Sequence, residues 1–519
     1  MGVVTPLEWP ARDLLSHRVD ATPQRTALID ADEGTQWTYR EFDRRVEAAV
    51  AALEREGIGR GDRVGTLLDT RPAFAVLVFA AMRRGATLVP FHARETVPEL
   101  VSKASRTDLA ALVCGRETES TALEVARGLD EAPTLRSVDE PTDGAVSPVP
   151  TSPETGENTA SEPASLARED TAVIMFTSGT TGRPKGVRLT VGNLVASATA
   201  SALRLGVDPD DRWLCCLPMF HMGGLAPVLR STLYGTTVVI QRAFDPAETA
   251  RVIEREAVTG VSLVPTMCKR LLEVGWEPTD ALRFVLLGGA PASESLLERC
   301  RERNVPVYPT YGMTETASQI ATATPEETAT HEGTVGQPLV NTDVTIVDEE
   351  GQPVETGVPG EIVVSGPTVT PGYLEAEHTE SAVSDRGLRT GDIGRRDEDG
   401  RLWILNRRSD RIVTGGENVD PGEVIEVLRS HPNVADASVV GLADPEWGER
   451  VAALVVPAED GALEPESILA HCEDRLAGFK RPKTVAVADA LPRTASGTVD
   501  REAVRDRLRE DGVDVASRS

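Results

Sequence analysis

Residues 177–186 read TSGTTGRPKG and come directly after the apolar run AVIMF of residues 172–176. The apolar run predicts a buried strand, and the residues after it predict a loop. Glycines let a backbone approach a ligand closely, and consecutive N–H groups then form a concave site for an anion. Hydroxyl side chains and a lysine add donors and a positive charge, so the stretch predicts a binding loop for a polyphosphate. It is not a P-loop, because no Gly-Lys-Ser/Thr sequence opens a helix here.

Further motifs follow this loop in a fixed order. They are PMFHMGG at 218–224, GGAP at 288–291, YGMTE at 311–315, RTGD at 389–392 and RRSD at 407–410. Together with the loop, these motifs resemble the signature of the adenylate-forming enzymes, the superfamily of acyl-CoA synthetases, peptide-synthetase adenylation domains and luciferases. The resemblance extends over residues 10–505, almost the whole chain.

The resemblance implies a reaction in two steps. A carboxylate attacks the α-phosphate of ATP and expels pyrophosphate, and the thiol of CoA then attacks the acyl-adenylate. Proteins catalyse such displacements mainly by positioning the reactants and neutralising charge. The expected cofactor is therefore Mg²⁺, and the expected substrates are ATP, CoA and a small carboxylic acid.

The resemblance also assigns roles to single residues. Lys185, His221 and Glu315 are the expected catalytic residues, and Glu315 is the expected ligand of Mg²⁺, a cation that prefers carboxylate oxygens. A lone Thr-Gly-Asp is usually a turn, so the role of Asp392 depends on its distance from Arg407. The expected nucleotide contacts are Thr177, Ser178, Gly179, Thr180, Thr181, Lys185, Gly288, Gly289, Ala290, Tyr311, Gly312, Thr314, Asp392 and Arg407.

A narrower resemblance concerns the acyl site. Residues 217–225, Arg230 and residues 233–235 are similar to the 2-succinylbenzoate–CoA ligases of menaquinone synthesis. Arg230, on a helix expected to line the acyl pocket, would pair bidentately with a second carboxylate of the acid. The alternatives are a surface position or an ion pair within the chain, and ligases for medium-chain or aryl acids share much of this pattern. The expected acyl-site residues are His221, Gly223, Arg230 and Gly289.

The C-terminal part carries the expected hinge and CoA residues. Ser409 matches the hinge of the superfamily, and residues 415–419 resemble the glycine loop that lines its pantetheine tunnel. The expected CoA contacts are Gly415, Gly416, Arg450 and Lys480. For Arg450 and Lys480, ordinary solvated charges are an equal alternative.

One position departs from the superfamily pattern. Residues 491–501 match its last motif except at Thr498, where the family usually carries a lysine that reaches the α-phosphate during adenylation. Thr498 is therefore the residue at the expected catalytic lysine position. Its identity leaves a non-catalytic paralogue that binds nucleotide or acyl-adenylate as a further alternative.

The hydrophobic pattern predicts an α/β fold. Residues 63–68 and 86–90 predict strands on either side of a buried helix at 73–82, the rhythm of a parallel sheet with helices on both faces. Residues 336–364 predict a β-rich subdomain. We expect a large N-terminal domain over 1–408, a small mobile α+β lid domain over 409–505 and a tail over 506–519. Residues 138–170, rich in Pro, Ser, Thr, Glu and Gly, predict a disordered acidic loop within the N-terminal domain.

The composition excludes several classes of partner and site and favours one cellular compartment. The chain of 519 residues has 54 basic and 82 acidic residues and a formal charge of −28, and all but five of its basic residues are arginine. It shows no basic stripe for nucleic acid, no signal peptide, no membrane-length apolar run and no cysteine pattern for zinc or disulfides. We expect a cytoplasmic protein of a salt-loaded cell, where like-charge repulsion is screened. A homo-oligomer is compatible with the sequence.

The surface charge predicts salt dependence. At low ionic strength the acidic surface repels itself, so the chain is expected to unfold or aggregate, and to be active near molar KCl. Thermal unfolding in 0.1 M and 2 M KCl measures this effect. Equal stability in the two buffers would contradict the halophilic interpretation.

Thr498→Lys is expected to accelerate acid-dependent exchange of pyrophosphate into ATP. An ammonium group about 4 Å from a phosphate oxygen contributes up to roughly 4 kcal/mol at an effective dielectric near 20, and a threonine hydroxyl cannot replace that charge. Formation of thioester from preformed acyl-adenylate should change little. An unchanged exchange rate would mean that another cation, such as Lys480, Lys483, Arg493 or K⁺, already fills the role.

Overall fold

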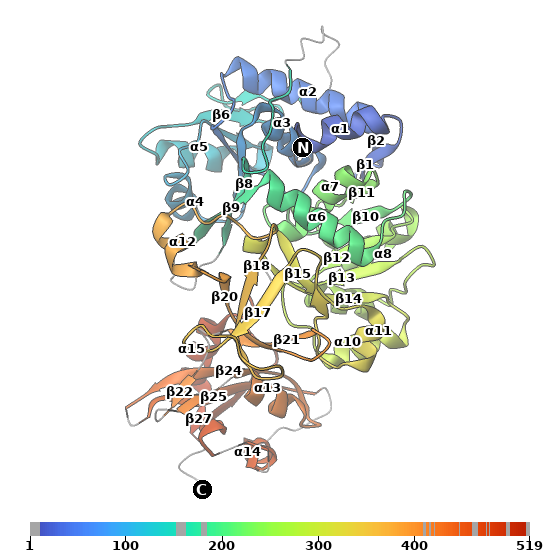
Figure 1. Ribbon diagram of the computed structural model, residues 1–519. Helices are drawn as coiled ribbons and strands as arrows, with labels where there is room; N and C mark the ends of the chain where they lie inside the picture. Colours follow the sequence, from blue (N-terminus) through green and yellow to red (C-terminus); the bar gives the residue numbers. More distant parts are fainter. Residues whose placement is uncertain are drawn as a thin grey trace, which may run out of the picture. The chain divides into compact units, whose positions relative to one another are not determined.

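The computed structural model describes residues 11–151, 162–177, 184–407, 412–414, 417–419, 421–445, 447–458, 465–473, 475–476, 478–494 and 499–514 (Figure 1). The chain divides into two compact units. The larger contains Met1–Val344 and Val364–Leu388, and the smaller contains Thr345–Val363 and Arg389–Ser519.

The larger unit is built on two sheets, each mostly parallel. Among the described residues the first has nine strands, parallel from β14 to β1 and antiparallel at both ends. Its order is β16 (Gln337–Pro338), β15 (Ser318–Thr322), β14 (Val307–Met313), β13 (Phe284–Leu287), β12 (Gly260–Leu263), β10 (Arg212–Cys215), β11 (Thr237–Ile240), β1 (Thr26–Asp30) and β2 (Thr35–Thr38).

The second sheet has seven strands in the described part of the chain, and only its last pair is antiparallel. Its order is β7 (Ser147–Pro148), β6 (Thr134–Ser137), β5 (Ala111–Cys114), β3 (Arg63–Leu67), β4 (Thr87–Pro90), β8 (Thr171–Thr177) and β9 (Lys185–Thr190). The predicted β-α-β unit is confirmed, because β3 and β4 pair in parallel and α3 (Pro72–Arg84) connects them.

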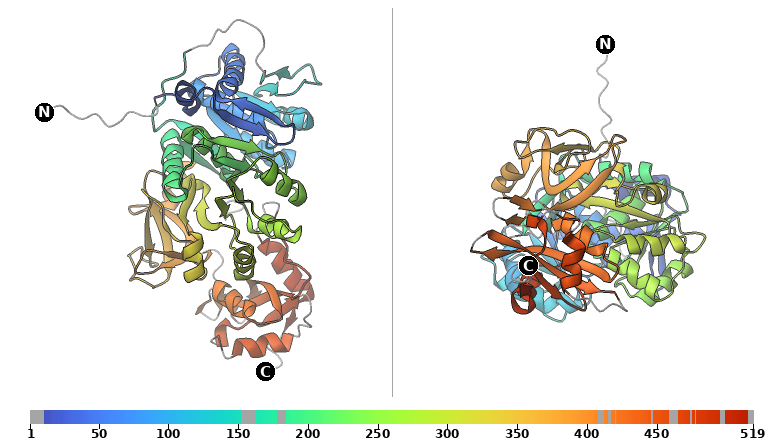
Figure 2. Two further views of the ribbon diagram at one scale, coloured as in Figure 1. Left: turned by 90° about the vertical axis from the view of Figure 1, so that its right-hand side faces the viewer. Right: turned by 90° about the horizontal axis from the view of Figure 1, so that it is seen from below.

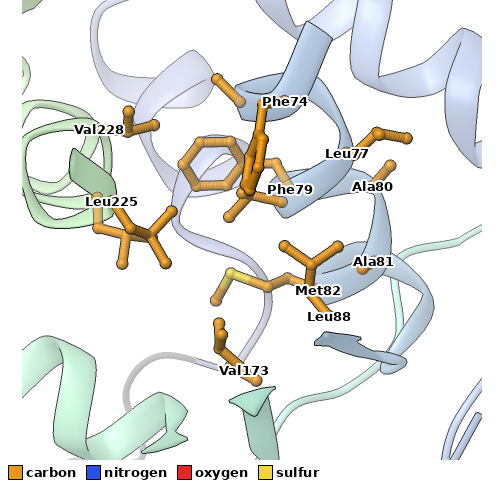
Figure 3. Packing of buried hydrophobic residues seen from close by; sticks show 14 of the residues in the cluster. Phe74, Leu77, Phe79, Ala80, Ala81, Met82, Leu88, Val173, Leu225 and Val228 are labelled. Atoms are coloured by element: carbon orange, nitrogen blue, oxygen red, sulfur yellow. The ribbon is translucent and has the colours of Figure 1, made fainter. Parts of the chain in front are cut away.

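Helix α3 lies between the two sheets. It is apolar on all sides from Pro72 to Met82 and buried along this length, because a helix without a polar face must be covered all round. The hydrophobic cluster around it draws on β1 and β11 of the first sheet and on β3, β4 and β8 of the second. Figure 3 shows Phe74 and Phe79 of α3 beside Leu225 and Val228 of α7. This middle layer contains α1 (Leu14–Ala21), α2 (Tyr39–Arg55), α3, α6 (Val191–Leu205) and α7 (Met222–Tyr234).

Further helices cover the outer faces. One cluster packs α8 (Pro246–Arg255), α9 (Pro265–Glu273) and α10 (Glu294–Glu302) on the first sheet. Another packs α4 (Val97–Ala104) and α5 (Glu119–Arg127) on the second. Successive side chains of β8 point to opposite faces of the sheet: Val173 faces the middle layer, and Ile174 faces the outer helices. The remaining elements are η1 (Arg116–Thr118), η2 (Thr314–Thr316), α11 (Pro325–Thr330) and α12 (Ala376–Ala382).

The predicted disordered loop is wrong for the parts that the structure describes. Within residues 138–151, Asp139 forms an ion pair with Arg71 at 2.8 Å, and Val146 and Val149 are buried. On the other side, Leu166 is buried against the middle layer. A few apolar side chains are thus enough to fix a segment of mostly polar composition. Residues 152–161 lie outside the described residues.

Antiparallel strands are present in residues 336–364, where the sequence predicts a β-rich subdomain. A five-stranded sheet among the described residues has the order β17 (Asp343–Val347), β18 (Gly360–Ser365), β20 (Gly387–Arg396) and β19 (Val383–Ser384), with β21 (Leu402–Arg407) beside β20. The division into units differs from the expected boundary, because residues 345–363 group with 389–519. Ser409 itself lies outside the described residues, so the boundary there stays a prediction.

The C-terminal part of the smaller unit has one sheet with helices on both faces, which can be followed in Figure 2. Along β25, Val451, Ala453 and Val455 face α13 and α14, whereas Ala452 and Leu454 face α15. The elements are β22 (Ile412–Thr414), β23 (Glu417–Val419), α13 (Pro421–Arg429), β24 (Val434–Asp444), β25 (Gly448–Pro457), α14 (Pro465–Glu473), η4 (Gly478–Lys480), β26 (Thr484–Val487), α15 (Arg501–Asp511) and β27 (Val513–Asp514).

Candidate active site

The predicted phosphate loop connects two antiparallel strands. β8 ends at Thr177 and β9 begins at Lys185, and these two residues pair directly across the hairpin. The lysine is therefore held at the base of the loop, opposite the first hydroxyl of the motif. Ser178, Gly179, Thr180 and Thr181 lie outside the described residues, so their predicted contacts stay predictions.

Other predicted residues lie at or directly after the carboxyl ends of strands in the parallel sheet, where open α/β sheets bind their ligands. Gly288, Gly289 and Ala290 come directly after β13, and Tyr311 and Gly312 lie in the last part of β14. β14 continues through the motif, because it pairs there with β15. Gly312 has to be glycine at this pairing: a Cβ would lie 1.7 Å from the carbonyl oxygen of Ser318.

Glu315 follows Thr314 in the short helix η2, and its side chain is buried. The hydroxyl of Tyr373 donates a hydrogen bond to Glu315 Oε1 at 2.9 Å. Lys185 Nζ lies 5.4 Å from the centroid of the same ring. Burial, and then the charge of Glu315, raise the pKa of Tyr373 well above its usual range, so the hydroxyl remains a donor. The structure thus brings Lys185 and Glu315 together through a residue that the sequence analysis missed.

Arg106 is a second residue that the sequence analysis missed. Its guanidinium group lies 5.1 Å from the ring centroid of Phe176, which precedes the phosphate loop, and donates to the carbonyl of Pro184, the last loop residue before β9, at 2.9 Å. Glu375 pairs with the same guanidinium at 3.0 Å. Arg106 therefore holds both ends of the loop in place. Contacts between residues so far apart in the chain leave no periodic signal in the sequence.

His221 stands at the start of α7 and belongs to an aromatic stack. The centroids of Phe220 and His221 are 4.6 Å apart, and those of His92 and Phe220 are 4.3 Å apart. Although His221 is exposed, desolvation by the surrounding protein, with the charges of His92 and Lys103, lowers its pKa to about 4. The ring is neutral at pH 7, which suits an aromatic wall and not a cationic partner. Gly223 follows in the first turn of α7.

Arg230 lies in the middle of α7 and is 2% exposed. Its Nη2 is 3.4 Å from the hydroxyl of Ser197, and its guanidinium carbon is 5.4 Å from the ring centroid of Trp213. Ser197 in turn donates to the carbonyl of Ala317, at 2.7 Å, two residues after Glu315. No described residue forms an ion pair with Arg230, and burial lowers its pKa. The alternative of a surface position is wrong, and no partner supports an ion pair within the described chain.

Asp392 and Arg407 are brought together within the smaller unit. They are directly opposite each other in the antiparallel pair β20–β21, and Asp392 is buried.

The contacts of the described CoA candidates give little information about their role. Arg450 pairs with Asp514 at 3.3 Å, and Lys480 Nζ lies 5.8 Å from the ring centroid of Phe479. The other predicted residues of this unit, Ser409, Gly415, Gly416 and Thr498, lie outside the described residues.

The residues around Glu315 fit a magnesium ion. The buried carboxylate of Glu315 in η2 and the hydroxyl of Thr314 next to it in the chain are hard oxygen donors. In the described part of the chain, no group of three or more His, Cys, Asp and Glu side chains is arranged to hold a metal. None of the described helices is both long and apolar enough to cross a membrane.

Comparison with known proteins agrees with this arrangement. Residues 15–374 match the AMP-binding enzyme family, and residues 423–498 match the AMP-binding enzyme C-terminal domain. The chain belongs to the AMP-binding enzyme family. It is 39% identical to the 2-succinylbenzoate–CoA ligase of Bacillus licheniformis over 489 residues, which are 94% of this chain and 98% of that protein. The predicted superfamily is thereby confirmed.

Solved structures show the same fold. The o-succinylbenzoate CoA synthetase (MenE) of Bacillus subtilis, in complex with the acyl-adenylate intermediate OSB-AMP, has a TM-score of 0.84 and 35% identity, covering 95% of this chain and 98% of that one. The same enzyme with ATP and magnesium has a TM-score of 0.83, 35% identity and coverage of 96% and 99%. ATP-bound MatB of Rhodopseudomonas palustris reaches 0.86 at 28% identity, with coverage of 96% and 99%. The large α/β domain and smaller C-terminal domain are confirmed.

Proposed function

We propose that this chain is an AMP-forming acid–CoA ligase that converts 2-succinylbenzoate to 2-succinylbenzoyl-CoA through an acyl-adenylate, a step of menaquinone biosynthesis. The observation that carries the choice of acid is Arg230, a buried guanidinium without a carboxylate partner among the described residues. The similarity to 2-succinylbenzoate–CoA ligases over 94% of the chain supports the same choice.

Another arginine of the same chain shows why this observation matters. Arg83 is buried to the same degree, but Asp13, Asp43 and Glu47 surround it and raise its pKa. A buried charge without such partners costs several kcal/mol. Arg230 is therefore best explained if a ligand supplies the anion, and the second carboxylate of 2-succinylbenzoate has the planar geometry that a guanidinium group pairs with. A monocarboxylic acid has no group for this position.

In the adenylation step, the phosphate loop, Thr177 and Lys185 hold the β- and γ-phosphates, and Thr314 contacts the α-phosphate. Glu315 holds Mg²⁺, which when bound supplies positive charge to the phosphate oxygens. Gly288, Gly289, Ala290, Tyr311 and Gly312 line the adenine site, and Asp392 and Arg407 bind the ribose. Uncharged His221 forms a wall of the acyl site with Gly223 and Gly289. These groups catalyse by positioning and by charge neutralisation.

In the second step CoA replaces AMP on the acyl group. Gly415, Gly416, Arg450 and Lys480 are the proposed CoA contacts, Ser409 is the proposed hinge, and Thr498 occupies the position of the superfamily lysine. We further propose a cytoplasmic setting at high salt, on the basis of the charge of −28.

Replacing Arg230 by leucine tests the acid. The KM for 2-succinylbenzoate should rise about tenfold to a hundredfold, because one charge-assisted partner is worth roughly 1.5–3 kcal/mol, while the KM for benzoate should change little. Arg230→Lys keeps the positive charge but loses the bidentate geometry of the guanidinium group. Its KM for 2-succinylbenzoate should lie between those of the wild type and of Arg230→Leu. The measurement is AMP and thioester formation with each acid.

The same assay separates the alternatives. Equal losses with both acids in Arg230→Leu would make Arg230 a structural residue. Thioester formation from benzoate or hexanoate but not from 2-succinylbenzoate would contradict the proposed acid. A wild-type chain that binds ATP but forms no thioester from any of these acids would contradict the ligase and favour a binding paralogue.

A further inference from the structure

Residues 370–375 run along β9, next to the phosphate loop. The amide of Arg188 donates to the carbonyl of Gly372 at 3.1 Å, and the amide of Leu374 donates to the carbonyl of Gly186 at 2.8 Å. Val187 and Tyr373 are bridge partners between these two hydrogen bonds. The 370–375 segment is therefore fixed to the strand that begins with Lys185.

The same segment holds Glu315 at two points. The amide of Thr370 donates to the backbone carbonyl of Glu315 at 2.7 Å, and the hydroxyl of Tyr373 donates to its carboxylate at 2.9 Å. Gly372 between them has a φ of +140°, and a Cβ there would lie 2.5 Å from Thr379 Oγ1. Only glycine allows this bend, which lies directly before the tyrosine that reaches Glu315.

The carboxylate of a glutamate otherwise rotates easily, because the terminal torsion of this side chain has a broad energy profile. A hydrogen bond from the Tyr373 hydroxyl to Oε1 restricts that rotation. We propose that Tyr373 is a positioning residue, whose hydroxyl fixes the Glu315 carboxylate in the orientation that receives Mg²⁺·ATP. This inference rests on the proposed function, in which Glu315 takes the metal.

The geometry also connects the metal site to the phosphate loop. The Tyr373 ring that carries the hydroxyl lies 5.4 Å from Lys185 Nζ, a distance at which a cation is attracted to an aromatic face. Glu375, two residues further on, pairs with Arg106, which holds both ends of the loop. One short segment thus orients the carboxylate, the lysine and the base of the loop together.

Tyr373→Phe tests the role of the hydroxyl, because it keeps the ring and its packing. Calorimetric titration of the chain with ATP, without acid or CoA, is done once with Mg²⁺ and once with EDTA. We expect Tyr373→Phe to weaken ATP binding about tenfold with Mg²⁺, the lower end of what one hydrogen bond to a charged group contributes. With EDTA the variant and the wild type should bind ATP alike, and AMP binding should also be unchanged.

Tyr39→Phe is the matched control. It also removes the hydroxyl of a buried tyrosine, whose hydrogen-bond partners are the carbonyls of Ser231 and Thr236, at 2.9 and 2.6 Å, and not a predicted site residue. We expect this control to lower thermal stability without changing the effect of Mg²⁺ on ATP binding. An equal loss of ATP affinity with Mg²⁺ and with EDTA in Tyr373→Phe would overturn the positioning role.

Glu315→Gln separates failure of this inference from failure of the proposed function. If this variant loses the effect of Mg²⁺ while Tyr373→Phe keeps it, Tyr373 is not a positioning residue and Glu315 remains the metal ligand. If Glu315→Gln keeps the full effect of Mg²⁺, Glu315 is not the metal ligand, and the proposal for Tyr373 fails with it. In the double variant, Tyr373→Phe should add nothing, because both changes act through the same carboxylate.

Discussion

The direct pairing of Lys185 with Thr177 across the hairpin of β8 and β9 is the constraint on which the candidate site depends. It closes the phosphate loop and sets where β9 begins. The 370–375 segment then follows β9 by backbone hydrogen bonds, and its tyrosine reaches Glu315. A shift of one residue in this register would turn every side chain of β9 to the opposite face. It would move Lys185 away from the loop and remove the backbone positions to which the segment is bound.

Electrostatics around this hairpin differ from those of the chain as a whole. The protein carries 82 acidic and 54 basic residues, yet Lys103, Arg106 and Lys185 gather around Phe176, Pro184 and Tyr373 at the two ends of the loop. Carboxylates offset part of this charge, since Glu95 pairs with Lys103 and Glu375 with Arg106. A local group of cations on an acidic protein concentrates the field where a polyphosphate would bind.

Local features of the sequence were sufficient to predict the strands of the parallel sheets and to locate the site motifs. The buried helix at 73–82 and the strands around it could be predicted because burial on all sides produces a continuous apolar run. Arg106 and Tyr373 could not, because their partners Pro184 and Glu315 lie 78 and 58 residues away and meet them only in the folded chain. The disorder predicted for 138–170 failed for a related reason. Composition does not reveal that Val146, Val149 and Leu166 are buried in a core formed by strands distant in the sequence.

We propose that this chain forms an acyl-adenylate from 2-succinylbenzoate and passes the acyl group to CoA. To test this, the chain is mixed with ATP, Mg²⁺ and 2-succinylbenzoate at high salt without CoA, and the quenched mixture is analysed by mass spectrometry. We expect 2-succinylbenzoyl-adenylate bound to the protein together with released pyrophosphate, and conversion of this adenylate to thioester and AMP once CoA is added. Binding of ATP without any adenylate or pyrophosphate would show that the chain does not activate this acid.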